Sequence, residues 1–270
     1  MKAAFQGEPG AYSEEAGYSY FDQVEMIPEA SFDAVFSSVT SEACQSGLIP
    51  IENSLAGSIH QNYDLLLSHN LSIVGEYFLR VRHCLIGFPG ITSAEIKKVI
   101  SHPQALGQCA STLKELGVQT EPVYDTAGSV KILKSSGEKT TAAIASKRAA
   151  EIYKMHIIQE GIEDNPENYT RFLEIAHQPI KPSGKAKTSI VFTLNNQPGA
   201  LFKAMSVFAL RDIDLTKIES RPLAGKPWEY LFYIDFIGAI DDQSTSKALA
   251  HLDEYALMLR VLGSYPVFHE

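Results

Sequence analysis

Short polar turns follow several apolar runs of this sequence, and they carry the side-chain types that bind anions or transfer protons. The turns are Gly7–Ser13, Pro50–Ser58, Ser101–Gln104, Asp125–Ser129 and Asn168–Phe172. Where such a turn opens a helix, backbone N–H groups point toward one place and favour an anion. In open α/β sheets these turns meet at the carboxyl ends of the strands. Their repeated occurrence therefore predicts one crevice that binds a small anionic molecule.

Ordinary structural roles are open for the individual residues. Three are common helix N-cap types, and three others could form one Asx turn. The N-cap candidates are Ser13, Ser58 and Asp125, and the Asx-turn candidates are Asn53, Ser54 and Gly57. His102 could be a turn residue before Pro103 with no role in proton transfer. Arg171 could form a structural ion pair with Glu174 or Glu167.

Common catalytic signatures are missing from the sequence. It contains no GxGxxG, P-loop, HExxH or GxSxG string, which disfavours nicotinamide, ATP, zincin and α/β-hydrolase chemistry. Cys44, Cys84 and Cys109 have no metal-ligand spacing and fit a reducing compartment. The apolar run Tyr230–Ile240 is too short to span a bilayer, and the N-terminus lacks a signal-peptide pattern. We therefore expect a cytoplasmic protein without a membrane partner.

The charge balance is acidic. There are 23 Lys and Arg against 32 Asp and Glu, a net charge of −9, which argues against a nucleic-acid partner. Lys2 is the only cationic side chain before Arg80. An anion site in this part of the chain would need local devices, such as helix N-termini or one well-placed Arg.

The polar turns must be positioned by the strands and helices around them, and these alternate up to about residue 176. The expected strands are Lys2–Phe5, Val24–Ile27, Gln45–Ile51, Leu71–Leu79, Lys98–Ser101, Val118–Val123, Ala142–Ala145 and Ile157–Gln159, with a further β-like segment from Asn168. The expected helices are Ser13–Tyr20, Phe32–Thr40, Ser58–Ser68, Pro103–Leu116, Thr126–Lys134 and Ser146–Tyr153. This alternation predicts parallel sheets in two α/β lobes around a cleft.

A Pro-, Gly- and Lys-rich segment from His177 to Lys187 predicts a linker. The order after it is β-α-β-β-α-β, typical of a ferredoxin-like α+β unit. Its expected elements are Thr188–Leu194, Gly199–Leu210, Leu215–Arg221, Glu229–Ile237, Ser244–Leu257 and Arg260–Val267, with a hairpin around PLAGKPW. We therefore expect a first domain at residues 1–178, a linker at 179–187 and a second domain at 188–270.

Several strings resemble the successive motifs of the prephenate dehydratase family, in its order and spacing. They are FQGEPGAYSEEA, IPIENSLAGS, SHPQALGQC, DTAGS, AAIASKRAA and NYTRF. PGAL (Pro198–Leu201) and ESRP (Glu219–Pro222) are similar to the ligand motifs of the family's C-terminal regulatory domain, of the ACT type. The resemblance covers nearly the whole chain. The family's frequent N-terminal chorismate mutase helix is missing from it, so we expect a monofunctional enzyme.

The resemblance implies a two-lobed, periplasmic-binding-protein-like catalytic domain followed by an ACT domain. It implies conversion of prephenate to phenylpyruvate, water and carbon dioxide in phenylalanine biosynthesis. Because formation of the aromatic ring drives this reaction, no metal or organic cofactor is expected. L-Phenylalanine is the implied feedback effector, and a homodimer or tetramer is the implied assembly.

By the same resemblance, Thr170 assists the departing hydroxyl by hydrogen bonding, and Arg171 binds a carboxylate. Adjacent residues on a regular strand point to opposite faces, so both roles are possible only if the backbone turns there. His102 and Glu52 are alternative acids. The expected substrate-binding residues are Ser13, Glu52, Asn53, Ser54, Gly57, His102, Thr126 and Phe172. The expected effector-binding residues are Gly199, Ala200, Leu201, Glu219 and Ser220.

Three other functions fit parts of the sequence. Arogenate dehydratase performs the same chemistry on the aminated substrate. A non-catalytic solute-binding protein would also have two α/β lobes, although no signal peptide is evident. An amino-acid sensor would use only the second domain, but the intact TRF and IENS strings argue against a degenerate first domain.

Overall fold

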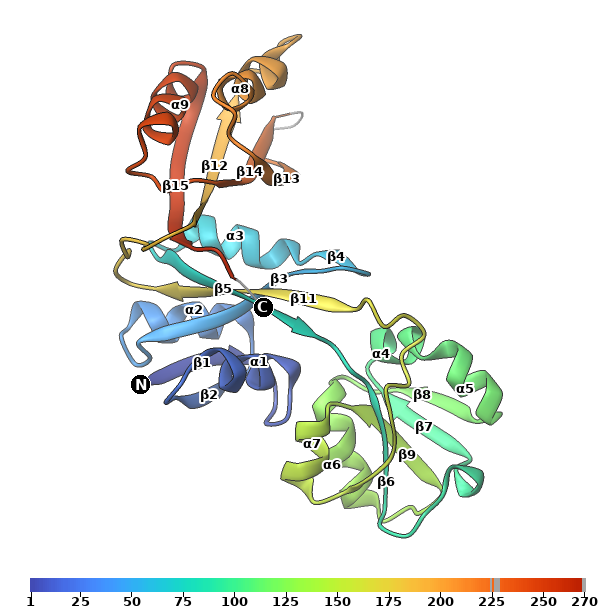
Figure 1. Ribbon diagram of the computed structural model, residues 1–270. Helices are drawn as coiled ribbons and strands as arrows, with labels where there is room; N and C mark the ends of the chain where they lie inside the picture. The colour runs from blue at the N-terminus through green and yellow to red at the C-terminus, as the bar shows by residue number, and fades with distance from the viewer. Residues whose placement is uncertain (224, 226–228, 269–270) are drawn as a thin grey trace. The chain divides into compact units, whose positions relative to one another are not determined.

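The computed structural model describes residues 1–223, 225 and 229–268 (Figure 1). The chain forms two compact units. The first contains residues 1–69 and 77–172, and the second contains residues 70–76 and 173–270. Two strands, β5 (Ser72–Arg80) and β11 (Tyr169–Ala176), contribute residues to both units. No helix among the described residues is at once long enough and apolar enough to cross a membrane.

The first sheet has six strands in the order β2-β1-β3-β11-β5, with β4 paired to β3. Its other strands are β1 (Lys2–Gln6), β2 (Glu25–Glu29), β3 (Ser46–Asn53) and β4 (Gly57–Ser58). The accompanying helices are α1 (Tyr12–Tyr20), α2 (Phe32–Thr40) and α3 (His60–Ser68). Ala16 of α1 packs with Leu48 of β3 and Phe172 of β11. This packing fixes the start of α1 beside the ends of β3 and β11.

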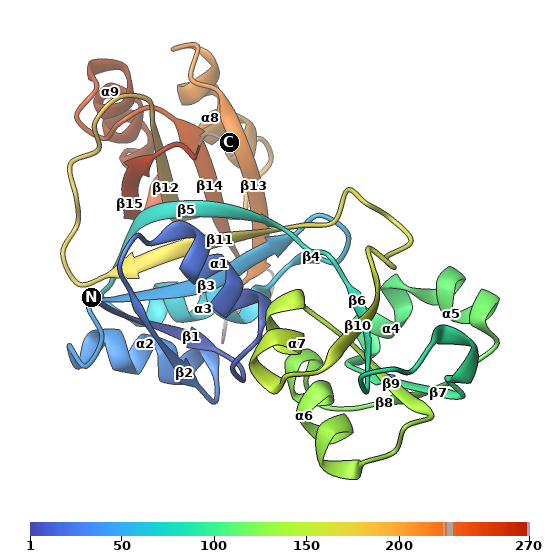
Figure 2. The same ribbon diagram turned by 60° about the horizontal axis from the view of Figure 1, so that its bottom comes forward.

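The second sheet of the first unit has the order β10-β6-β9-β7-β8. Its strands are β6 (Cys84–Gly87), β7 (Lys98–Ser101), β8 (Gln119–Pro122), β9 (Thr141–Ala145) and β10 (His156–Glu160). Its helices are the 3-10 turn η1 (Ser93–Glu95), α4 (Pro103–Gln108), α5 (Ala110–Leu116), α6 (Thr126–Ser136) and α7 (Lys147–Tyr153). Alternating residues divide the core into two layers: Ile86 and Ala143 pack with α6 and α7, and Leu85 and Ile144 with α4 and α5. Figures 1 and 2 show these helix pairs on opposite sides of the sheet.

The second unit contains an antiparallel sheet in the order β13-β14-β12-β15. Its strands are β12 (Ala186–Leu194), β13 (Leu215–Pro222), β14 (Tyr230–Ile237) and β15 (Ala256–Pro266), and its helices are α8 (Ala200–Ala209) and α9 (Gln243–Asp253). Ile190, Phe208, Phe236 and Leu252 belong to the core between the sheet and these helices. The element order and sheet order are those of the expected ferredoxin-like unit.

Segment 70–76 packs tightly within this second unit. The Lys187 ammonium donates to both carboxylate oxygens of Glu76, at 2.7 and 2.8 Å, and both side chains are buried. A Cβ added to Gly263 would lie 2.1 Å from the carbonyl oxygen of Ile73. The residues that follow the linker thus pack against a segment more than 100 positions before it in the sequence.

Two expectations about the first domain were wrong. Its sheets are mixed rather than parallel, because β4 pairs antiparallel with β3 in the first sheet and β6 pairs antiparallel with both β9 and β10 in the second. The helix expected over residues 103–116 is interrupted at Cys109. Asp164 is the physical cause. Its backbone N–H donates to the Gln108 carbonyl, and its carboxylate accepts from Ser111 N at 3.1 Å, which caps a new helix.

Smaller differences concern element ends. Ser58 lies in β4, so α3 begins at His60, and α9 ends at Asp253 because Ala256 and Leu257 already belong to β15. Strand β6 was not expected from the sequence. The expected hairpin turn around PLAGKPW lies largely outside the described residues.

Candidate active site

A pocket of about 180 Å³ in the first unit collects side chains from both sheets. Its wall has an apolar part and a part rich in neutral hydrogen-bonding groups. The lining residues are Tyr12, Ser13, Pro50, Asn53, Ile59, Val81, His83, His102, Gln104, Ala105, Gln108, Thr126, Thr170 and Phe172. Six of the expected catalytic and substrate-binding residues are therefore brought together: Ser13, Asn53, His102, Thr126, Thr170 and Phe172.

Thr170 and Asn53 form the centre of the polar wall. Asn53 ends β3 and Thr170 lies near the start of β11, the neighbouring strand. Asn53 Nδ2 donates to Thr170 Oγ1 at 3.0 Å, and the two residues are only 7% and 9% exposed. A hydroxyl that accepts a hydrogen bond keeps its own proton for another acceptor. The Thr170 O–H is thus available to an oxygen atom bound in the pocket.

The backbone fixes the orientation of the Asn53 amide. Its Oδ1 accepts from the N–H groups of Leu55 and Ala56, at 3.1 and 2.9 Å, in an Asx turn. Because a backbone N–H can only donate, the Asn53 NH₂ must face the other way, toward Thr170. The Asx turn therefore holds the Asn53 NH₂ group in position to donate to Thr170.

A chain of hydrogen bonds extends from Asn53 along the pocket wall. Asn53 Nδ2 also donates to Asn168 Oδ1 at 2.8 Å, and Asn168 Nδ2 donates to Gln108 Oε1 at 3.2 Å. His83 Nε2 lies 2.8 Å from the same Gln108 oxygen. The hydroxyl of Tyr12 lies 2.8 Å from His83 Nδ1 and 2.9 Å from the Arg82 carbonyl. Burial lowers the pKa of His83 and raises that of Tyr12 well above its usual value, which favours the neutral forms of both.

Three helices begin at the pocket, and their first turns differ in how they are capped. Asp125 caps α6 through Gly128 N, and His102 Nδ1 accepts from Gln104 N at the start of α4. At α1 the N-cap is Ala11, whose side chain has no hydrogen-bonding atom. The N–H groups of Tyr12 and Ser13 have no protein acceptor within the described part of the chain. The start of α1 is thus the terminus best suited to an external anion.

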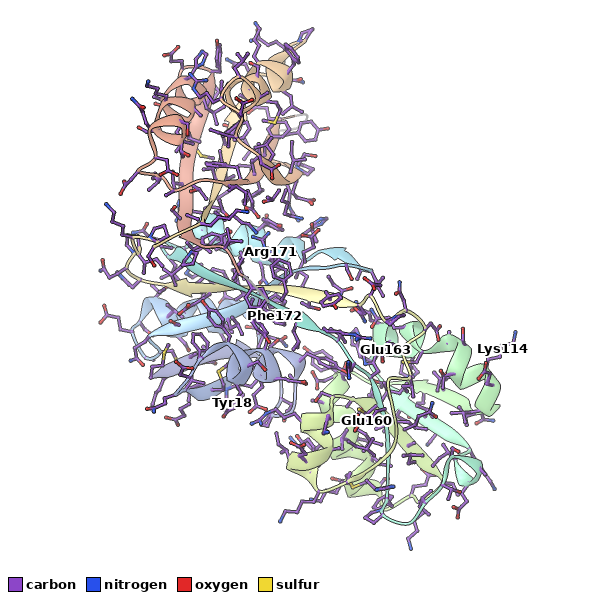
Figure 3. All side chains as sticks on the ribbon, viewed as in Figure 1. Tyr18, Lys114, Glu160, Glu163, Arg171 and Phe172 are labelled. Carbon is purple, nitrogen blue, oxygen red and sulfur yellow. The ribbon has the colours of Figure 1, made fainter. Side chains whose placement is uncertain are left out.

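Four expected site residues do not line the pocket. Arg171 lies on the opposite face of β11 from Thr170 and Phe172, because the strand is regular there, and its guanidinium carbon is 6.0 Å from the centre of the Phe78 ring. Figure 3 shows Arg171 and Phe172 on opposite sides of the strand. Ser54 instead joins the two strand ends, donating through Oγ to the Glu167 carbonyl and accepting from Tyr169 N. Glu52 and Gly57 belong to the β3–β4 ladder, in which Glu52 pairs with Ser58 and Gly57 with Asn53.

Sequence reasoning missed Tyr12, His83 and Gln108 as pocket residues. Gln108 lies seven residues after Ser101, at the end of a short helix whose early termination depends on Asp164. His83 lies in the connection between β5 and β6, where no turn signal precedes it. Tyr12, directly before Ser13 in a turn already singled out, and Gln108, within the string SHPQALGQC, each had a usable signal.

A second pocket of about 310 Å³ lies in the second unit, around the start of α8. Its lining residues are Leu194, Asn195, Asn196, Gln197, Gly199, Ala200, Leu201, Phe202, Tyr230 and Phe232. Three expected effector residues, Gly199, Ala200 and Leu201, belong to it. Ser220 is the cross-strand neighbour of the lining residue Phe232, whereas Glu219 is the neighbour of Tyr233 and lies 3.9 Å from the Lys217 ammonium.

The first unit also has a larger hollow of about 1070 Å³. It lies between the β1–α1 loop and α6, where Lys131 Nζ is 3.1 Å from Glu8 Oε2. Neither Thr170 nor Asn53 lines it, so it lacks the convergent hydrogen-bonding groups of the smaller pocket. Across the described residues, no three His, Cys, Asp or Glu side chains come together in a way that could hold a metal ion.

Comparison with known proteins finds relatives that match nearly the whole chain. The family model described as prephenate dehydratase matches residues 3–180. A protein of Arabidopsis thaliana named arogenate dehydratase/prephenate dehydratase 2, chloroplastic, is 49% identical, over 99% of this chain and 73% of its own. The solved prephenate dehydratase of Arthrobacter aurescens in complex with L-Phe is 29% identical with a TM-score of 0.90, covering 98% of this chain and 89% of that one. A structure described as a novel type of quorum quenching acylase is 34% identical with a TM-score of 0.93, covering 99% and 98% of the two chains.

Proposed function

Because the chain belongs to the prephenate dehydratase family, we propose that it converts prephenate to phenylpyruvate, water and carbon dioxide. The enzyme class, carbon–oxygen lyase, is common to the family. In this reaction the ring hydroxyl leaves, the ring carboxylate departs as carbon dioxide, and the electron pair of the broken C–C bond completes the aromatic ring. One proton is taken up to turn the departing hydroxide into water. The protein must bind the dianion, stabilise the leaving oxygen and keep water from the ring.

The geometry of Thr170 supports its role at the leaving oxygen. Asn53 donates to Oγ1, so the Thr170 O–H is free to donate to the substrate hydroxyl. As charge moves onto Oγ1 in the transition state, the Asn53 hydrogen bond stabilises it. This pair is the observation that carries the proposal. His102 is a second donor, because its Nδ1 accepts from Gln104 N and its Nε2 then carries the proton.

The start of α1 suits a substrate carboxylate. The N–H groups of Tyr12 and Ser13 open a helix of nine residues, and the Ser13 side chain lines the same pocket. The pocket lining also includes the apolar residues Pro50, Ile59 and Phe172. These apolar side chains would contact the ring and leave the departing carboxylate poorly solvated, which favours loss of carbon dioxide.

The charges of the pocket favour prephenate over arogenate. Arogenate differs by an ammonium group in place of the keto oxygen, and no Asp or Glu is among the described residues that line the pocket. An ammonium without a carboxylate partner gains less from binding than a keto oxygen that accepts a hydrogen bond. Arogenate dehydratase is the alternative function, since relatives are named for both activities.

The acylase relative suggests amide hydrolysis, which the site supports less well. Such a reaction needs a nucleophile activated by a neighbouring base. The hydrogen-bond partner of Thr170 Oγ1 is an amide, and burial raises the pKa of Cys84 to about 12. A hydroxyl next to an amide donor is suited to donating its proton rather than to attacking a carbonyl.

The second unit supports feedback control by L-phenylalanine. We assign residues 188–270 to an ACT-type regulatory domain, 1–178 to the catalytic domain and 179–187 to the linker. Gly199, Ala200 and Leu201 line a pocket large enough for an amino acid, with Phe202 and Phe232 beside it. A relative has been solved in complex with L-Phe. ACT-type units commonly pair, so we expect a homodimer or tetramer, and free buried cysteines fit a reducing compartment such as the cytoplasm.

The test is a turnover assay with prephenate and, separately, with arogenate, each with and without L-phenylalanine. We expect phenylpyruvate from prephenate, at a rate that L-phenylalanine lowers. Turnover of arogenate alone would replace the substrate assignment and keep the mechanism. Turnover of neither substrate would overturn the proposal, and hydrolysis of an N-acyl substrate in the same preparation would favour the acylase alternative.

A further inference from the structure

His83 lines the pocket and contacts the side chain of Gln108. Of the imidazoles among the described lining residues, only that of His83 is buried. Its two ring nitrogens have separate partners, Gln108 Oε1 at Nε2 and the Tyr12 hydroxyl at Nδ1. The nitrogen that carries the proton determines whether the Gln108 side chain turns its oxygen or its NH₂ group into the pocket.

The directions of the hydrogen bonds can be followed from the backbone. Leu55 N and Ala56 N fix the Asn53 amide, Asn53 Nδ2 fixes Asn168 Oδ1, and Asn168 Nδ2 then donates to Gln108 Oε1. The Gln108 oxygen is therefore the atom that faces His83, and it can only accept. Followed from Asn53, this chain places the His83 proton on Nε2 and leaves Nδ1 as an acceptor. The Tyr12 O–H then has two acceptors within reach, His83 Nδ1 at 2.8 Å and the Arg82 carbonyl at 2.9 Å.

The consequence lies at Gln108. With Oε1 held by His83 and Asn168, the Gln108 Nε2 makes no protein hydrogen bond within the described residues, although the side chain lines the pocket. We propose that His83 is a positioning residue, which as the Nε2–H tautomer keeps the Gln108 NH₂ turned into the pocket to donate to a substrate oxygen. Without the second donor the amide could rotate and present its oxygen to an anionic substrate. The inference rests on the proposed dehydratase site.

Two substitutions of His83 separate this role from a merely structural one. In His83→Gln, the amide nitrogen can occupy the place of Nε2 and donate to Gln108. In His83→Asn, the side-chain amide reaches only the place of Nδ1, so the partner of Tyr12 is kept and the donor to Gln108 is lost. We expect kcat to fall about 10- to 100-fold in His83→Asn and by less than about 5-fold in His83→Gln, with smaller changes in KM.

Both variants are also made in a Gln108→Leu background. If His83 acts through Gln108, the difference between His83→Asn and His83→Gln should disappear there. Equal losses in the two single variants, or a difference that persists in the Gln108→Leu background, would overturn the proposal. Urea unfolding of each protein excludes a loss of folded enzyme as the cause.

Long-range ¹H–¹⁵N NMR of the wild-type enzyme reads the tautomer of His83 without any assay of activity. The signal is assigned by its loss in His83→Gln. We expect a proton on Nε2, and a proton on Nδ1 would contradict the inference even if the enzyme is active. Conversely, if no dehydratase turnover is found, the proposed function fails while the tautomer can still be read.

Discussion

At the scale of single residues, the proposed reaction depends on the hydroxyl of Thr170. Thr170→Val removes the O–H and keeps the shape of the side chain, so the free energy of unfolding should change little. Loss of one preorganised donor at a developing charge lowers kcat by about 10²- to 10³-fold. Steady-state kinetics with prephenate would measure it. Thr170→Ser is the matched control and should retain most of kcat, because Asn53 can still donate to its oxygen.

A large rise in KM with kcat retained in Thr170→Val would instead assign Thr170 to binding. Calorimetric titration of prephenate onto the variant separates the two, since an enzyme without the leaving-group donor should still bind the dianion. That variant would also allow the substrate to be bound without being consumed.

Glu15 provides a test of residue-scale electrostatics. Burial raises the pKa of its carboxyl, and Oε2 is buried without a hydrogen-bond partner. A raised pKa in the folded protein means that folding favours the protonated acid, so stability falls as the pH rises from the ordinary Glu value of about 4.3 through the raised pKa. Glu15→Gln should therefore be more stable than the wild type at pH 7, with the difference shrinking toward pH 4. Urea unfolding at both pH values measures this, and a difference independent of pH would contradict it.

The residues that line the catalytic pocket could be predicted only in part from the sequence. Thr170, Asn53 and Ser13 lie in strings at strand ends, where local pattern and resemblance agree. Arg171 could be doubted from strand alternation alone, and the structure places it away from the pocket. Gln108 lies within the quoted string SHPQALGQC, but its place in the pocket depends on the distant Asp164. His83 lies outside every quoted string, and its position depends on strand pairing between distant segments.

At the scale of helices and strands, local patterns located most elements. Phe32–Thr40 and Lys98–Ser101 have the bounds that their apolar periods predict. The failures have long-range causes. The antiparallel direction of β6 depends on its pairing with β9 and β10, and the break at Cys109 on a residue from another connection. Neither the pairing of β6 nor the contact with Asp164 can be predicted from the residues next to the affected element.

The ion pair between Glu76 of β5 and Lys187 of β12 is a long-range contact whose contribution to stability can be measured. Lys187→Met would leave the Glu76 carboxylate buried beside a methionine, whereas the wild-type ammonium donates to both of its oxygens. Breaking one side of a buried ion pair costs about 3–5 kcal/mol. We expect a large loss of thermal stability, measured by calorimetry. Glu76→Leu with Lys187→Met removes both charges and should lose clearly less. An equal loss in the single and double variants would mean that packing, rather than the unpaired charge, is responsible.

At the scale of the whole molecule, the sequence boundary and the compact units differ in an informative way. The linker expected at residues 179–187 separates the alternating strand and helix pattern of the first domain from the β-α-β-β-α-β order of the second. The second unit nevertheless includes residues 70–76, held by the Lys187–Glu76 pair and by the close approach of Gly263 to Ile73. Glycine at 263 is the sequence sign of that approach, but its partner could not be known from the sequence. Strand β5 contributes residues to both units and so gives a continuous backbone between them.

This continuity makes an allosteric effect of L-phenylalanine testable as a property of the whole chain. Coupling between two sites is reciprocal, so if L-phenylalanine weakens prephenate binding by some factor, prephenate weakens L-phenylalanine binding by the same factor, typically 5- to 150-fold. Calorimetry on Thr170→Val, which should bind prephenate without consuming it, measures both. Leu201→Ala, in the wall of the second pocket, should lower the affinity for L-phenylalanine and leave prephenate affinity unchanged in its absence. If Leu201→Ala leaves the mutual effect intact, L-phenylalanine competes in the catalytic pocket and the second domain is not its site.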